Sequence, residues 1–477
     1  NHYDHRNGGG FLYGLLSAFV RLWALPITQM PVFDFFREFT GVATYRPWRL
    51  FASTASPSLD CSSKSTTSPV IHDLHFTFVT CPPRAHRAPP LLVPSPVQMP
   101  LEIILAIIEA ACPPDAPDIA LLKACSLVCR TWSVPVQKLL FKNVQLRTAK
   151  AFDSFNAAVG PDSQHARVLR DAVRHLRVVM DHCQPSYLHQ HAFARAVAMC
   201  PNLQELDLAL YGLAEPGVVE APGSIEASRL RRRAPPFDAQ TMSILRSGPH
   251  IKSLSFSNWS ENQQCIFQLL EIWPGLESLS MSGTSPHLTE STSFPHRLPP
   301  CFPGALKELR INFQTAPSLE FMGWLLHQSA SSRSLRSLTF ERDPCPDLFE
   351  FMMDSFSQDL QCLSIPNCTS LEHARSIDNC SNLRFLRMDR PQPNPLAYKS
   401  VPAAIRHLAL GVDRDTPLQP VIDVVRGRKD LQVVTVRLWN GGECHRLLPA
   451  LRIACAYRGV ELRTTHDSLE YRSLTVG

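Results

Sequence analysis

The chain has 477 residues, of which 44% are hydrophobic, a balance typical of a soluble globular protein with two or three domains. The formal net charge is +5, and the first 98 residues hold 8 Lys and Arg against 5 Asp and Glu, so the remaining body is nearly neutral. A near-neutral body gives no electrostatic reason to expect a nucleic-acid partner. The 15 cysteines form no paired framework and no zinc pattern. We therefore expect packed or free thiols, with no metal or other cofactor.

The first 98 residues are predicted to contribute no folded domain. Residues 11–27 are apolar and aromatic, but Arg21 interrupts them, and neither a basic start nor a clear cleavage site marks a signal peptide. Residues 52–98 are rich in Ser, Pro and Thr, which predicts disorder. One interpretation takes residues 1–98 as mis-annotated upstream sequence, with Met99 as the true start. The alternative is a targeting or anchoring segment.

Residues 99–146 are predicted to form a small domain of three short helices. Pro100 stands at a favoured first helical position, and apolar residues recur behind it at helical spacing. Asp118 is placed to cap a second helix that carries an apolar stripe as far as Trp132, and a third apolar group follows Pro135. So small a unit, apolar on more than one face, implies a permanent partner or a close junction with the rest of the chain, such as a cap on it.

Three parts of this segment resemble the F-box family. Pro100 and Glu102-Ile103 match its Leu-Pro-x-Glu-Ile opening, with Met99 in place of Leu. The run Leu127-Val-Cys-Arg-Thr-Trp132 matches its Leu-Val-Cys-Arg-x-Trp centre, and Leu140-Phe141 matches its close. The loop at 114–117 is longer than the compact family form and is expected to lengthen the link between the first two helices.

Further along, the phrase apolar-x-x-apolar-x-apolar recurs. Its copies start at Leu203, Ile251, Leu276, Leu306, Leu335, Leu360, Leu383, Ile405 and Leu431. After a first interval of 48 residues the starts are 22 to 30 residues apart, a period typical of stacked arrays whose units bury one another's apolar faces. Helical spacing appears between phrases, at 265–270, 349–353 and 421–425. Each unit therefore reads as a strand, a turn and a helix.

The phrases resemble leucine-rich repeats of the irregular kind found in intracellular proteins. The Asn or Cys expected after the third apolar position occurs only sporadically, at Asn258, Asn312 and Cys368. The predicted fold class is α/β: a three-helix F-box-like domain, then a leucine-rich-repeat solenoid over 165–470 with a flexible insertion at about 214–236. An ordinary α/β domain with a parallel sheet is the alternative, and the regular period argues against it.

Together the two resemblances imply a non-catalytic substrate receptor of a Skp-cullin-F-box ubiquitin ligase, of a combination common in fungal genomes and located in the cytoplasm or nucleus. The F-box would bind a Skp-family adaptor and, through it, the cullin-RING ligase. Its candidate contacts are Pro100, Leu101, Ile103, Ile104, Ile107, Leu127, Val128, Arg130 and Trp132.

The repeats would hold an unidentified protein target on the open face of their strands, where aromatic and Arg side chains are natural hot spots. The candidate residues are Asp207, Arg310, Phe385, Arg387, His407 and Arg437.

Two other functions remain open, and neither is enzymatic. The sequence holds no phosphate-binding Gly-Lys-Ser/Thr loop, no His-Glu-x-x-His and no Gly-x-Ser-x-Gly. One alternative is a repeat scaffold without a ubiquitin role, in which residues 99–146 pack on the repeats and bind no adaptor. The other is a secreted or membrane-anchored ectodomain, suggested by residues 11–27 and by Asn-x-Ser/Thr triplets at Asn258, Asn367 and Asn379; it predicts glycosylation and paired cysteines. A membrane partner is not expected.

Overall fold

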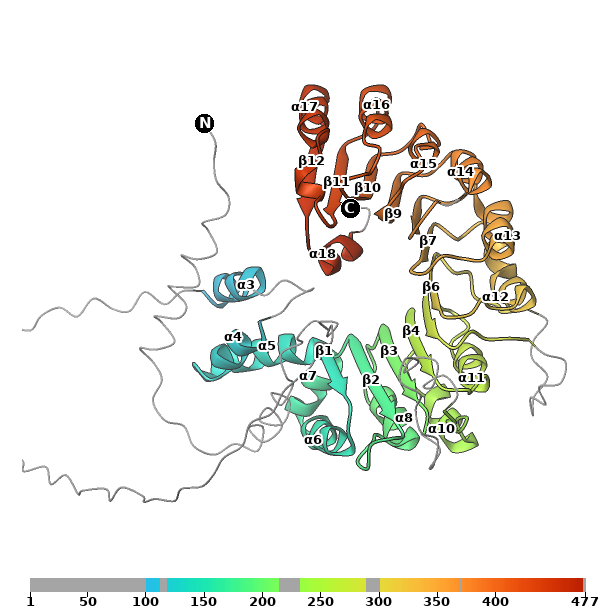
Figure 1. Cartoon of the computed structure of the whole chain (residues 1–477). Coiled ribbons are helices and arrows are strands. Elements are labelled where there is room, and N and C mark those ends of the chain that lie inside the picture. Colours follow the sequence, from blue (N-terminus) through green and yellow to red (C-terminus); the bar gives the residue numbers. More distant parts are fainter. Residues whose placement is uncertain (1–99, 112–117, 214–231, 289–300, 369, 475–477) are drawn as a thin grey trace, which may run out of the picture.

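The computed structural model describes residues 100–111, 118–213, 232–288, 301–368 and 370–474. The predicted disordered segment 1–98 and most of the insertion at 214–236 lie outside these residues. Twelve strands form one all-parallel sheet in the described residues, and consecutive strands are neighbours throughout. The sheet bends into an arc with the strands on its inner, concave side and the helices outside (Figure 1). This arrangement is an α/β solenoid of alternating strand and helix units, consistent with leucine-rich repeats.

The elements have the following bounds. The strands are β1 (Asn143–Leu146), β2 (His175–Asp181), β3 (Glu205–Tyr211), β4 (Ser253–Trp259), β5 (Ser278–Gly283), β6 (Glu308–Phe313), β7 (Ser337–Phe340), β8 (Cys362–Ile365), β9 (Phe385–Pro391), β10 (His407–Val412), β11 (Val433–Leu438) and β12 (Glu461–Thr465). The helices are α3 (Leu101–Ala111), α4 (Ile119–Ser126), α5 (Arg130–Lys142), α6 (Ala149–Val159), α7 (Gln164–Ala172), α8 (Gln190–Ala198), α10 (Ala239–Arg246), α11 (Gln264–Ile272), α12 (Leu319–Ser331), α13 (Pro346–Phe356), α14 (Leu371–Asp378), α15 (Leu396–Lys399), α16 (Gln419–Gly427), α17 (Leu448–Arg458) and α18 (Ser468–Ser473), with a 3-10 turn at Gly442–Cys444.

The strand phrase builds the core because side chains alternate between the two faces of a strand. In β5, Leu279 and Met281 are buried on the helix side, while the serines that alternate with them face the concave side. The register stacks equivalent positions, so Leu279 lies between Leu254 of β4 and Leu309 of β6. Each fully buried Leu contributes about 1.5–3 kcal/mol of hydrophobic stabilisation, and every unit repeats the layer.

All nine predicted phrases lead into strands, β3 to β11, and the three predicted helical runs lie in α11, α13 and α16. Three further strands were not predicted. Two of them carry the same phrase, as Phe141/Val144/Leu146 before and within β1 and as Val173/Leu176/Val178 at β2. The sheet therefore begins upstream of the predicted boundary at residue 165. The third, β12, lacks the phrase because Thr464 stands where Val436 stands in β11.

The helical segment at the N-terminal end has a small core of its own. Ile108 of α3, Leu122 and Cys125 of α4, and Val136 of α5 are buried together. Helix α5 then runs directly into β1, and its Phe141 is part of the solenoid core. The three helices are thus joined to the solenoid through one continuous helix, as the expected close junction requires.

One boundary in this segment was predicted wrongly. The second helix was expected to continue to Trp132 and to end at Pro135, but α4 ends at Ser126 and α5 starts at Arg130 and passes through Pro135. Pro135 removes the N–H that would bond to the carbonyl of Thr131, and its ring crowds that carbonyl. Thr131 lies on the exposed side of α5, where a carbonyl that tilts outward can bond to water. The predicted cap is confirmed: the Leu121 N–H donates to Asp118 Oδ1 at 2.9 Å.

Candidate functional site

The nine predicted adaptor contacts lie directly before α3, on α3, in the short turn between α4 and α5, and on the first turn of α5. None of them is among the four buried residues of the small core. Pro100 and Arg130 are exposed. Two large apolar side chains are also exposed, Ile103 at 50% and Leu127 at 54%, which is unusual for Ile and Leu. Exposed apolar side chains on so small a module lose their contact with water only when a partner covers them.

The other five candidates are half-buried. Ile104 and Trp132 pack against the small core, so their side chains also hold the three helices together. Leu101, Ile107 and Val128 are partly exposed. A substitution at Ile103 or Leu127 therefore changes the surface with little effect on the core, whereas one at Trp132 changes both.

The concave face of the solenoid has two contrasting halves, and the N-terminal half has a floor of small polar side chains. Six serines occupy the open positions of β4 and β5, and all are partly exposed. They are Ser253, Ser255, Ser257, Ser278, Ser280 and Ser282. At one edge of this floor the rings of Tyr211 and Trp259 stack with centroids 6.5 Å apart.

Two predicted target contacts lie in this half, and both are in ion pairs with neighbours. The Asp207 Oδ2 of β3 lies 3.1 Å from the Arg177 Nε of β2, and the Arg310 Nη1 of β6 lies 3.7 Å from the Glu341 Oε1. These side chains are partly exposed, so the pairs are screened by solvent and contribute little to stability. They remain accessible to a partner.

In the C-terminal half of the concave face, helix α18 folds back inside the arc and covers part of β9 and β10 (Figure 1). Tyr471 of α18 is 0% exposed and packs with Phe385 of β9 and Ala409 of β10. Its hydroxyl donates to the carbonyl of Met388 at 3.1 Å. Phe385 and Arg387 do stand at open strand positions, as predicted, but their expected exposure is wrong because α18 buries both.

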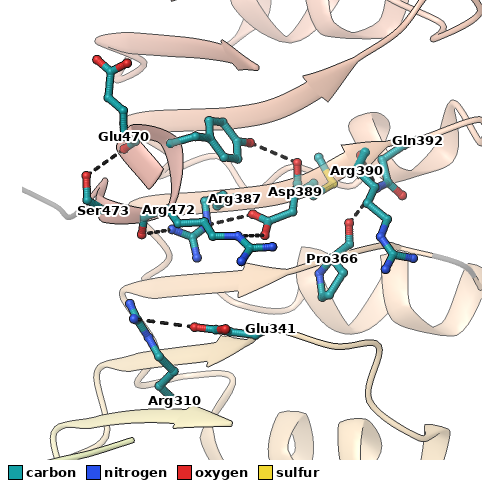
Figure 2. A network of polar contacts seen from close by, with 12 residues as sticks. Arg310, Glu341, Pro366, Arg387, Asp389, Arg390, Gln392, Glu470, Arg472 and Ser473 are labelled. Atoms are coloured by element: carbon teal, nitrogen blue, oxygen red, sulfur yellow. Dashed lines mark hydrogen bonds and ion pairs between the residues drawn. The ribbon is translucent and has the colours of Figure 1, made fainter. Parts of the chain in front are cut away.

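Beneath α18 lies a buried group of charges (Figure 2). Arg387 Nε is 3.1 Å from Asp389 Oδ1, and the Arg387 Nη1–H donates to the carbonyl of Arg472 at 2.7 Å. The Arg472 guanidinium in turn lies 3.6 Å from Asp389 Oδ2. Burial lowers the pKa of Arg387, and the Asp389 carboxylate opposes that shift. Asp389 therefore neutralises a buried strand arginine and an arginine of the covering helix at once.

A β-bulge positions this group. The register between β9 and β10 shifts at Leu410/Gly411, and the Trp439 Nε1–H donates to the carbonyl of Asp389 at 3.1 Å. A Cβ on Gly411 would lie 2.6 Å from that carbonyl and 2.8 Å from Trp439 Nε1, so only glycine fits here. The same Trp439 ring carries the Arg437 guanidinium 4.3 Å above its centroid. Arg437, a predicted target contact, thus borders the covered area and stays partly exposed.

His407, the last predicted target contact, is half-buried at the start of β10. Its Nε2 is 2.9 Å from Thr435 Oγ1, and its ring meets Phe385 edge to face at 4.9 Å. Burial, followed by the positive charge of Arg463, lowers the pKa of His407 to about 4, against an opposing effect of Glu461. The imidazole is therefore neutral near pH 7.

Sequence reasoning missed the residues that cover this half. Tyr471 and Arg472 follow the last predicted repeat, and a single aromatic residue in a short polar run carries no periodic signal. Asp389 could have been predicted from the sequence, because it stands two residues after Arg387 and therefore on the same face of the strand.

Neither the protein-family models nor the curated proteins include one that matches this chain. Among the residues that the structure describes, no helix has both the length and the apolar character to cross a membrane, and no group of His, Cys, Asp and Glu is placed to hold a metal ion. Each of the twelve cysteines in that part of the chain is a free thiol. Asn258 of the first Asn-x-Ser/Thr triplet is buried, and its Nδ2 donates to the carbonyl of Asn262 at 2.6 Å.

Proposed function

We propose that the protein is the substrate-recognition subunit of a Skp-cullin-F-box ubiquitin ligase. In this proposal helices α3 to α5 bind a Skp-family adaptor, and the concave face of the solenoid binds a target protein. The chain itself performs no chemistry; it raises the effective concentration of a target lysine near a ubiquitin-loaded enzyme. The proposal places the protein in the cytoplasm or nucleus, where its free thiols stay reduced.

The observation that carries the proposal is the apolar surface of the N-terminal helices. Ile103 and Leu127, which the F-box resemblance assigns to the adaptor contact, are the large apolar residues that this small module leaves most exposed. Ile119 and Val134 extend the exposed apolar surface on α4 and α5. A partner that buried these side chains would remove the unfavourable contact with water, and this stabilisation scales with the apolar area covered.

The junction with the solenoid also supports this function. Because α5 continues into β1 and Leu140 packs against both cores, an adaptor on the helices would be held at a fixed distance from the concave face. A rigid connection suits a receptor that must present its target to a distant enzyme. The same junction supports the second candidate, a binding solenoid whose first three helices serve only as a cap.

Co-purification of the full chain with a Skp-family adaptor tests the proposal. We expect a stoichiometric complex with the parent and none with the Ile103→Asp, Leu127→Asp variant. The matched control is Ile453→Asp, Tyr457→Asp, which changes two exposed apolar residues of α17 at the opposite end of the solenoid. Circular dichroism verifies that all three proteins are folded. A folded parent that does not bind the adaptor would contradict the proposal and leave the cap function.

A further inference from the structure

Helix α18 is attached to the concave face by few side chains. Tyr471 is buried and Leu474 packs beside it, whereas Leu469 is 74% exposed and Glu470, Arg472 and Ser473 also face solvent. A six-residue helix has no stability in water without tertiary contacts. Elements held by so few buried contacts open at much lower free energy than the core of a fold. Helix α18 is therefore the element of this half that can leave the sheet while the sheet stays folded.

The surface beneath α18 has the composition of a recognition site. Phe385, Arg387 and Asp389 occupy open positions of β9, and α18 contacts all three through Tyr471 and Arg472. Aromatic and arginine side chains of this kind dominate binding energy in protein interfaces. The open positions of β4 and β5, by contrast, hold six serines and, at the end of β4, Trp259.

The contacts of α18 are those that a bound peptide would make. The ring of Tyr471 fills an apolar site and its hydroxyl donates to a main-chain carbonyl of β9. Arg472, the next residue, offers its guanidinium to Asp389 and its carbonyl to Arg387. Tyr471 and Met388 are 83 residues apart in the chain, so this is a long-range docking contact and not a local turn.

We propose that α18 is an intramolecular occupant of the target site, and that the target carries an unphosphorylated Tyr followed by a basic residue which displaces it. This inference rests on the proposed use of the concave face for target binding, and it is independent of adaptor binding. Tyr471 is 0% exposed and its hydroxyl donates a hydrogen bond to the Met388 carbonyl, so a phosphate on this oxygen would lose that bond and would not fit the buried site. The neighbouring Asp389 selects the basic residue.

The test uses a fluorescein-labelled synthetic peptide with the sequence of residues 467–474, Asp-Ser-Leu-Glu-Tyr-Arg-Ser-Leu, and measures its binding to the full chain by fluorescence anisotropy. In the parent, α18 competes with the peptide. In the Tyr471→Ala, Arg472→Ala variant the site is vacated, and we expect on the order of 10- to 100-fold tighter binding than to the parent. The matched control is Leu469→Ala on the outward side of the same helix, which should bind the peptide as the parent does.

Two altered peptides test the chemistry of the site. The peptide carrying Tyr471→Ala and the peptide phosphorylated on its tyrosine should both fail to bind the vacated variant. If the phosphorylated peptide binds as well as the unmodified one, the assigned target chemistry is wrong. If the folded variant binds no peptide better than the parent does, α18 is a fixed part of the fold and the proposal is overturned.

Hydrogen exchange on the parent gives a second test that needs no substitution. The Tyr471 N–H bonds to the Asp467 carbonyl at 3.1 Å, so its exchange reports the opening of α18. We expect this amide to exchange well before the amides of β10 and β11, which remain protected. If the Tyr471 amide exchanges as slowly as the amides of those strands, α18 leaves the sheet only when the whole solenoid unfolds. That result would contradict the proposal. Loss of adaptor binding would leave both tests unaffected, so failure of the proposed function is distinguishable.

Discussion

The two halves of the concave face share one backbone plan and differ in what their open positions carry. Strands β4 and β5 present serines, which the described residues leave partly exposed, whereas β9 presents Phe385, Arg387 and Asp389 beneath α18. The helix-side core is the same in both halves, with Leu279 and Leu408 equally buried. The repeat phrase thus specifies the solenoid and leaves its inner surface free to diverge. Binding properties follow from the open positions and from what covers them.

The charged pairs of the two halves should respond very differently to neutralisation, and this is the largest expected effect. Asp389→Asn leaves Arg387 buried without its partner, which should lower the free energy of unfolding by up to about 3–5 kcal/mol, and by no more than the free energy at which α18 opens and lets water reach Arg387. Asp207→Asn breaks the partly exposed pair with Arg177 and should change the free energy of unfolding by at most about 1 kcal/mol. Urea unfolding followed by circular dichroism measures both. Equal losses would show that the Arg387–Asp389 pair is solvated and that α18 does not cover it.

The bulge beneath the covered half should tolerate no added methyl group. Gly411→Ala places a Cβ against the Asp389 carbonyl and the Trp439 indole, and we expect a loss of about 1–3 kcal/mol in the free energy of unfolding. Gly427→Ala is the control, because no atom lies within 4 Å of its added Cβ and alanine is the better helix former. Thermal unfolding of the two variants compares them. A neutral Gly411→Ala would mean that the strands are farther apart than described.

Removal of one hydroxyl tests how α18 is held. Tyr471→Phe keeps the buried ring and loses the hydrogen bond to Met388, so the free energy of unfolding should fall by about 0.5–1.5 kcal/mol. The Met388 carbonyl then lacks that donor. The same urea titration measures the change, and α18 amides should exchange faster in the variant. Unchanged stability together with unchanged exchange would show that the hydroxyl bond does not hold the helix.

The stability of the protein should depend on pH through His407 in the C-terminal half, and this effect is smaller than those above. The pKa of His407 is about 4 in the fold, below the ordinary value of 6.5, so between these values the unfolded chain binds a proton that the folded chain does not. Stability is therefore lost as the pH falls from about 6.5 towards 4. His407→Gln should reduce this slope and leave stability at pH 7.5 nearly unchanged. Urea unfolding at a series of pH values measures it, and an unaltered slope would contradict the assigned burial.

Periodicity predicted the strands and part of the helices because they are local patterns that recur. The two missed strands at the N-terminal end carry the same phrase, as Phe141/Val144/Leu146 and Val173/Leu176/Val178, so they were recoverable from sequence. The covering of Phe385 by Tyr471 was not, because the contact joins residues far apart in the chain and depends on where a six-residue helix docks. Sequence placed the candidate residues on the correct face and failed on the exposure of Phe385 and Arg387.

Calorimetric titration of the full chain with a purified Skp-family adaptor tests the central claim most directly, namely that one end of the molecule binds the adaptor and the concave face serves the target. The account predicts one-to-one binding by the parent. It predicts the same affinity for the Tyr471→Ala, Arg472→Ala variant, and no binding by Ile103→Asp, Leu127→Asp. No heat of binding from the folded parent, or equal binding by the Ile103→Asp, Leu127→Asp variant, would contradict the account.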